Sequence, residues 1–70
     1  MDKMNFKENL VELIKINKMP QQKIANAIGV SQRTVSKWIN GQSEPTATNI
    51  FKLALYFGVS ADFLLGLSED

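Results

Sequence analysis

Apolar residues recur at helical spacing from the first positions of the chain onward. Near the N-terminus they return every three or four positions, at Phe6, Leu10, Leu13 and Ile14. This period places them on one face of a helix. Asn5 and Glu8 stand at the spacing of a capping box, in which each side chain bonds to the other residue's backbone amide. We therefore expect a first helix over 6–16 that ends at Asn17 and Lys18.

Four further segments show the same pattern between start and stop signals. Pro20 suits a helix start, because its missing N–H falls among donors that have no partner in the first turn. Preferred N-cap residues precede the other three segments, at Ser31, Thr46 and Ser60. Glycines that can close a helix in the left-handed conformation follow, at Gly29, Gly58 and Gly66. The sequence thus predicts helices over 21–28, 32–39, 47–57 and 61–65, no strand, and an all-α fold.

Length and composition limit the chain to one small domain without catalytic groups. We expect a single unit over 1–70 with its core in about 5–66, because 70 residues hold one core. Cysteine and histidine are absent, so the usual zinc ligands and the usual activating base are missing. The carboxylates fall on separate elements without catalytic pairing. We expect no enzyme activity, no metal, no cofactor and no small-molecule ligand.

The chain carries no targeting or membrane signal. No apolar run approaches the roughly 20 residues that span a bilayer. The opening residues Met1-Asp2-Lys3-Met4 lack the hydrophobic stretch of a signal peptide. The expected location is therefore the cytoplasm, with no membrane as partner.

The positive charge of the chain is concentrated in its middle, although the net charge is small. The formal net charge is only +1. Residues 15–41 nevertheless contain no acidic residue and five basic ones, which are Lys15, Lys18, Lys23, Arg33 and Lys37. A basic block within a folded domain is typical of a phosphate-binding surface. Scattered solvated lysines are the alternative explanation.

The most specific pattern lies in 21–41. Two short helices are joined by Gly29-Val30-Ser31, with the small Ala25 four positions before the glycine and Val35 six positions after it. Helices that cross steeply need a small residue where their backbones approach, and the turn needs a left-handed residue without a Cβ. The pattern predicts a helix-turn-helix unit, which places its second helix in the major groove of DNA. A helical hairpin with a glycine turn and no DNA is the alternative.

The exposed face of the third helix is suited to reading bases. It consists of Gln32, Arg33, Ser36 and Lys37, and it contains no acidic residue. Arginine and lysine match the two acceptors of guanine, and glutamine matches adenine. A face that served only solubility would usually include glutamate, so this composition favours base contacts by these four residues.

These segments resemble the phage-repressor and Cro class of helix-turn-helix proteins, the xenobiotic-response-element family. The central stretches that carry the resemblance are Met19-Pro20-Gln21-Gln22-Lys23-Ile24-Ala25, Gly29-Val30-Ser31, Val35-Ser36-Lys37-Trp38, Asn40-Gly41 and Pro45. The later stretches are Leu53-Ala54 and Phe57-Gly58-Val59-Ser60-Ala61-Asp62-Phe63-Leu64-Leu65-Gly66. The match covers roughly 5–66. It implies a lambda-repressor-like five-helix domain that binds double-stranded operator DNA, commonly as a symmetric dimer.

The resemblance assigns roles to individual positions. The family reads bases with the first residues of the third helix, here Gln32 and Arg33, with Ser36 and Lys37 one turn further on. In the family, the glutamine that opens the second helix and the polar residue after the third helix contact the DNA backbone; these are Gln21 and Asn40 here. We expect further backbone contacts from Ser31, Lys23, Gly41 and Lys18.

The sequence departs from the family pattern at three places. Pro20 replaces the usual serine or threonine cap. Lys18 stands where a turn glycine is common, and it can add a phosphate contact. Ile14 and Ile39 replace an arginine and a glutamate that pair in many relatives, so we expect an apolar contact in place of that ion pair.

The C-terminal half contains more apolar residues than its helices need for packing. We expect Phe57, Val59 and Leu64 in the core, and Leu65 and Leu67 in a homodimer interface made by the C-terminal helices. A symmetric dimer places two recognition helices about 34 Å apart, which matches a near-palindromic operator.

The functional hypothesis is a transcriptional repressor that occupies its operator as a dimer. An antitoxin that binds both DNA and a protein, or a protein-interaction module on the same fold, is the alternative. The end of the chain shows no linker, which favours a complete small regulator over the DNA-binding part of a longer repressor.

Overall fold

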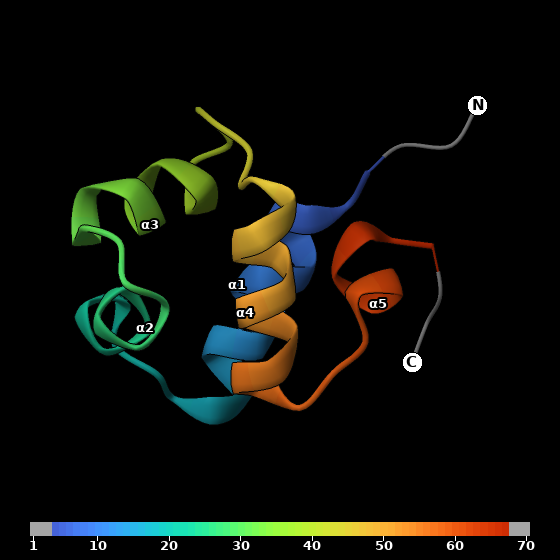
Figure 1. Ribbon diagram of the computed structural model, residues 1–70, viewed down its shortest axis with the longest axis horizontal. Helices are drawn as coiled ribbons and strands as arrows, with labels where there is room; N and C mark the ends of the chain where they lie inside the picture. The colour runs from blue at the N-terminus through green and yellow to red at the C-terminus, as the bar shows by residue number, and fades with distance from the viewer. Residues whose placement is uncertain (1–3, 68–70) are drawn as a thin grey trace.

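Five helices pack around one core in the computed structural model, which describes residues 4–67 (Figure 1). They are α1 (Phe6–Asn17), α2 (Gln21–Ile28), α3 (Gln32–Ile39), α4 (Ala47–Phe57) and α5 (Ala61–Leu65). The described residues contain no strand, so the expected all-α fold is confirmed. The expected bounds agree with the structure except at the end of α1, which continues by one residue to Asn17.

Side-chain caps begin three of the helices, as the sequence predicts. Each cap's hydroxyl oxygen accepts a hydrogen bond from the backbone N–H three residues later. Ser31 accepts from Thr34 at 3.1 Å, Thr46 from Asn49 at 3.2 Å, and Ser60 from Phe63 at 2.9 Å. Each such bond satisfies an amide that has no partner within its own helix. The local sequence therefore determines where α3, α4 and α5 start.

The prediction of a capping box at the start of α1 is wrong. The side chain of Asn5 makes no capping hydrogen bond, and its backbone dihedrals of −100° and 32° are not the extended ones of an N-cap. Gly66 packs against this residue so closely that a Cβ on Gly66 would come within 3.0 Å of the Asn5 nitrogen. The altered backbone of Asn5 thus accompanies a contact with Gly66 near the other end of the chain, and the local sequence pattern contains no sign of this contact.

The core is formed by residues from all five helices and contains no buried polar side chain among the described residues. Its members are Phe6, Leu10 and Leu13 of α1, Ile24, Ala25 and Ile28 of α2, Val35 and Trp38 of α3, Leu53 and Ala54 of α4, and Leu64 of α5. The rings of Phe6 and Trp38 meet edge to face with centroids 6.1 Å apart. This pair joins α1 to α3 and contributes about 0.5–1.5 kcal/mol beyond the buried area.

The sequence-based core assignments hold for the C-terminal half. Leu64 is fully buried, and Phe57 and Val59 are partly buried against the core. Ile14 and Ile39, which replace the paired arginine and glutamate of many relatives, are also partly buried against the same core.

Two hydrogen bonds from side chains hold the outer helices in position. The Lys52 ammonium of α4 donates to the carbonyl of Ile28 at 3.3 Å, at the negative end of α2. The Asn9 amide of α1 donates to the carbonyl of Phe63 at 2.7 Å. The first bond fixes α2, which carries part of the candidate site, against α4.

Lys18 has the left-handed backbone that helix C-caps adopt. Its φ and ψ are 51° and 48°, and it is the only residue other than glycine with positive φ in the described chain. Its N–H donates to the carbonyls of Ile14 and Lys15. The position thus has the conformation for which glycine is preferred.

We expect Lys18→Gly to raise the free energy of unfolding by about 1 kcal/mol, because glycine carries no Cβ penalty in the left-handed region. Urea unfolding of the two proteins measures this difference. The control is Lys18→Ala, which removes the charge but keeps the Cβ, and we expect its stability to stay close to that of the parent. An equal gain in both variants would assign the effect to charge rather than to the backbone.

Candidate nucleic-acid interface

The turn between α2 and α3 has the geometry that the sequence predicts. Ala25 and Val35 are fully buried, at 0% exposure. Gly29 has φ of 87°, and its N–H and that of Val30 both donate to the carbonyl of Ala25, at 2.8 and 3.0 Å. A Cβ on Gly29 would meet no atom within 4 Å, so the requirement for glycine here is conformational. These contacts fix the angle at which α3 leaves the turn.

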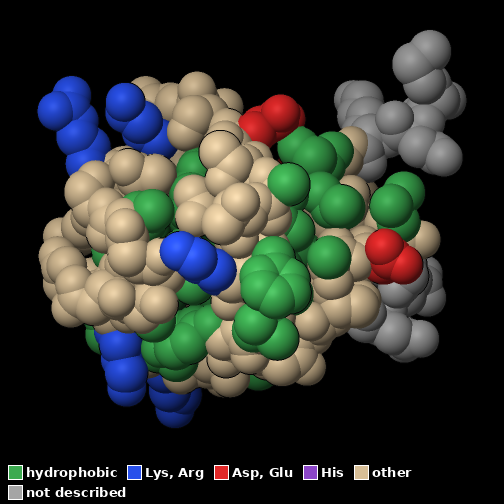
Figure 2. Space-filling view, in the orientation of Figure 1, with side chains coloured by type: hydrophobic (Ala, Val, Ile, Leu, Met, Phe, Trp, Pro, Cys, Tyr) green, Lys and Arg blue, Asp and Glu red, His purple; other side chains and the backbone are tan. Residues whose placement is uncertain are grey.

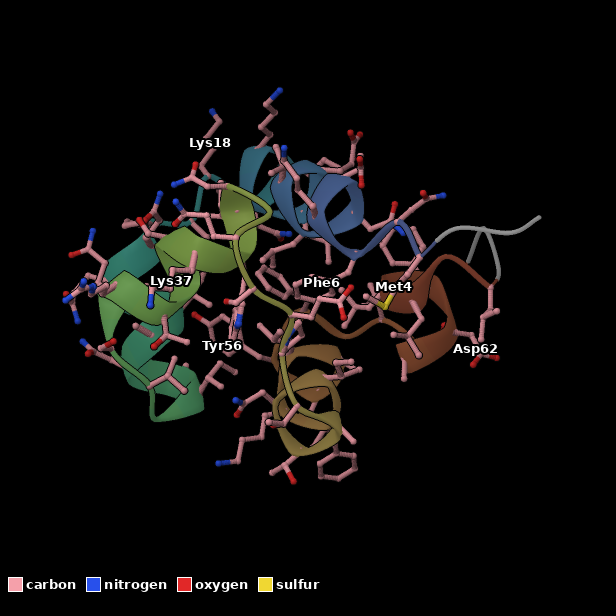
Figure 3. The ribbon with its side chains drawn as sticks, turned by 90° about the horizontal axis from the view of Figure 1, so that it is seen from above. Met4, Phe6, Lys18, Lys37, Tyr56 and Asp62 are labelled. Carbon is pink, nitrogen blue, oxygen red and sulfur yellow. The ribbon has the colours of Figure 1, made fainter. Side chains whose placement is uncertain are left out.

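The outer face of α3 is open and basic. Gln32, Arg33 and Lys37 are exposed, whereas Val35 and Trp38 on the opposite face are buried. Figure 2 shows basic side chains projecting from the end of the molecule that holds α2 and α3, and acidic side chains over other parts of that view. Lys37 points outward from α3 in Figure 3. Three of the four expected base-contacting residues are therefore accessible to a ligand.

Ser36, the fourth expected base-contacting residue, is placed differently. It is only partly exposed, and its hydroxyl donates to the Oε1 atom of Gln21 at 2.9 Å. The structure thereby brings together a residue expected to contact bases and a residue expected to contact the DNA backbone.

The residues expected at the DNA backbone come from several elements. Lys23 on α2, Ser31 in the turn, and Asn40 and Gly41 after α3 are all exposed. The hydroxyl of Ser31 already serves as the α3 cap and lies 3.0 Å from Thr34 Oγ1. Lys18 points into solvent from the turn between α1 and α2 (Figure 3). These residues come from α2 and from the three turns that precede α2, join α2 to α3 and follow α3.

Sequence reasoning missed Lys7. Its side chain passes over Gly41, where a Cβ would meet Lys7 Cδ at 3.4 Å and Nζ at 3.8 Å. The ammonium therefore lies at the turn that follows α3, and it has no carboxylate partner among residues 4–67. Its neighbour Phe6 packs on Trp38 and so brings the start of α1 to α3, but this contact is visible only in the folded chain.

The described residues contain no group of three metal-ligand side chains. Within residues 4–67, no helix is long and apolar enough to cross a membrane.

The chain belongs to the helix-turn-helix family of the Cro/C1 type. The family model described as helix-turn-helix matches residues 10–64. This span begins in α1, contains the turn at Gly29 and ends in α5. The resemblance on the central and C-terminal stretches is therefore confirmed.

Two curated regulators and one solved complex are similar to the chain. The HTH-type transcriptional regulator DicA of Escherichia coli is 38% identical over 53 residues, which are 76% of this chain and 39% of DicA. The HTH-type transcriptional activator BcrR of Enterococcus faecalis is 30% identical over 66 residues, 94% of this chain and 32% of BcrR. The chain thus spans 32% to 39% of the length of these relatives.

The solved structure is that of the P22 c2 repressor protein in complex with a synthetic operator. It superposes with a TM-score of 0.83 at 25% identity, covering 97% of this chain and all of the repressor chain. The lambda-repressor-like fold is confirmed by this likeness. The chain is accordingly a DNA-binding helix-turn-helix domain of the transcriptional-regulator type.

Proposed function

We propose that the domain binds double-stranded DNA sequence-specifically, with α3 in the major groove, and represses transcription by occupying a promoter in the cytoplasm. The open, acid-free face of Gln32, Arg33 and Lys37 on α3 carries this proposal. Ala25 of α2 and Val35 of α3 are fully buried in the core on the inner side of this unit, which supports a fixed presentation of the face. The likeness to a repressor solved with its operator supports the same conclusion.

Base reading and backbone binding are assigned to different side chains. Gln32, Arg33 and Lys37 reach base edges, where a bidentate arginine on guanine discriminates by about 1–3 kcal/mol. The phosphates on either side are bound by groups of other segments, namely the exposed Lys18, Lys23, Ser31, Asn40 and Gly41 and the partly buried Gln21. Lys7 joins this set because its ammonium lies beside Gly41.

The dimer interface that we propose lies on α4 and α5. Phe51, Leu55 and Leu67 are exposed at 62%, 68% and 70%. Phe51 and Leu55 line a shallow apolar groove together with Ala47, Ile50, Ala54, Val59, Ala61 and Leu65. Figure 2 shows hydrophobic side chains gathered over α4, and Figure 1 places α5 at the end of the molecule opposite α2 and α3.

An apolar surface of this kind on a small domain marks an interaction site. A second copy that covered the groove of its partner, and offered its own Phe51 and Leu55 in return, would leave both α3 helices open. This arrangement suits a near-palindromic site whose halves are about one DNA turn apart.

Selection from a randomised pool of DNA duplexes, followed by sequencing of the bound fraction, tests the proposed function. We expect a near-palindromic motif with half-sites about 34 Å apart. A single unrepeated half-site would contradict the dimer. Recovery of no motif, at low salt and with protein shown to be folded, would contradict DNA reading and favour a protein-interaction module.

Arg33→Ala and Lys7→Gln separate base reading from phosphate binding. On the selected operator we expect Arg33→Ala to lose about 1–3 kcal/mol, with a smaller loss on random DNA. Lys7→Gln should weaken binding to both duplexes by the same factor. It should also reduce the magnitude of the slope of log K against log salt concentration by about one. Fluorescence anisotropy titrations at several salt concentrations measure both quantities. A loss confined to the operator for Lys7→Gln would place that lysine at a base instead.

Leu55→Glu tests the proposed dimer surface. The buried charge should abolish self-association and the cooperative occupation of two half-sites, while binding to one half-site stays unchanged. The matched control is Ile16→Glu, because Ile16 of α1 is exposed at 67% but lies outside the groove. Sedimentation equilibrium of the two variants gives the association constants. Equal self-association of the Leu55→Glu variant and the control would move the interface elsewhere.

A further inference from the structure

A side-chain hydrogen bond joins the two helices of the helix-turn-helix unit. Ser36 Oγ in the middle of α3 donates to Gln21 Oε1 at the first residue of α2, at 2.9 Å. Both residues are partly buried, and they are 15 positions apart in the chain. The bond therefore connects a residue expected to read bases with one expected to hold a phosphate.

The bond determines which half of the glutamine amide faces outward. A glutamine side chain has a carbonyl oxygen that accepts and an NH₂ group that donates twice. Since Oε1 is engaged by the serine hydroxyl, the NH₂ group is the part left for a ligand, and it has no partner among residues 4–67. A group that presents only donors fits an acceptor such as a phosphate oxygen.

The position of Ser36 on its helix agrees with this role. It directly follows the fully buried Val35, and it lies on the side of α3 that meets α2, as its bond to Gln21 shows. Gln32, Arg33 and Lys37 are exposed, whereas Ser36 is only partly exposed. A short side chain in this place reaches the neighbouring helix more directly than the floor of a DNA groove.

We propose that Ser36 is a positioning residue. It holds the Gln21 amide so that its NH₂ group donates to a phosphate oxygen of bound DNA, and it touches no base itself. This inference rests on the proposed DNA binding and narrows the base-reading set to Gln32, Arg33 and Lys37. Because the glutamine is ordered before binding, less side-chain entropy is lost when the complex forms.

Ser36→Thr and Ser36→Val form a matched pair for the test, since they have nearly the same shape and differ in the hydroxyl. We expect Ser36→Thr to bind the selected operator like the parent. Ser36→Val should bind roughly three- to tenfold more weakly, as for the loss of one hydrogen bond. The loss should be the same on random duplex DNA and at every salt concentration, because no charge and no base contact is removed. Thermal unfolding shows that both variants are folded.

The Gln21→Ala background identifies the partner of the hydroxyl. In that background the affinities of the threonine and valine variants should become equal, because no amide remains to be positioned. A difference that persists there, or that depends on one base pair of the operator, would show that the hydroxyl contacts DNA directly and would overturn the proposal. Gln21→Glu keeps an acceptor for Ser36 but points a negative oxygen at the phosphate, so we expect it to bind more weakly than Gln21→Ala.

Parent protein in the same titrations separates the two levels of inference. A parent that binds the operator, with threonine and valine variants of equal affinity, refutes the positioning role alone. A folded parent that binds neither operator nor random DNA refutes the proposed function and the positioning role together.

Discussion

The close approach of α2 and α3 at Ala25 is the contact on which the interface depends. This side chain is fully buried, and its carbonyl accepts the N–H groups of both Gly29 and Val30. The same residue therefore has its side chain in the core and accepts the hydrogen bonds that close α2. A larger side chain here would push α3 away from α2 and turn its outer face, even though Ala25 lies within the core and can touch no DNA.

This geometry is held by the whole core rather than by the helices themselves. Helices of five to twelve residues are too short to be stable alone in water. The edge-to-face contact of Phe6 with Trp38 fixes α3 from below, and Lys52 fixes the end of α2 through Ile28. Because one contact comes from α1 and the other from α4, the orientation of the open face of α3 depends on helices outside the helix-turn-helix unit.

The sequence predicts those parts of the structure that depend on neighbouring residues. Caps such as Ser31 and closing glycines such as Gly29 act over three or four positions, so they locate the helices nearly to the residue. The sequence places Lys18 where a turn glycine is common, and the structure shows that this residue keeps the left-handed backbone of such a glycine. The sequence places the end of α1 one residue early: the helix continues to Asn17, whose side-chain amide donates to the carbonyl of Leu13 at 2.8 Å.

Predictions failed or were incomplete where two distant segments meet. Asn5 has the right neighbours for a capping box, but its backbone conformation accompanies a contact with Gly66. Lys7 is near Gly41 only because α1 packs against the end of α3. Both cases show tertiary contacts overriding or adding to a local pattern, which a single sequence does not display.

The same division separates what the domain needs to fold from what it needs to recognise. Gln32, Arg33 and Lys37 have no hydrogen-bond or ion-pair partner among the described residues, so replacing them removes no such bond from the fold. Ser36 differs, because its hydroxyl already has a partner within the protein. Base preference can therefore change through the three exposed side chains while Ala25, Gly29 and the bond between Ser36 and Gln21 keep α3 presented in the same way.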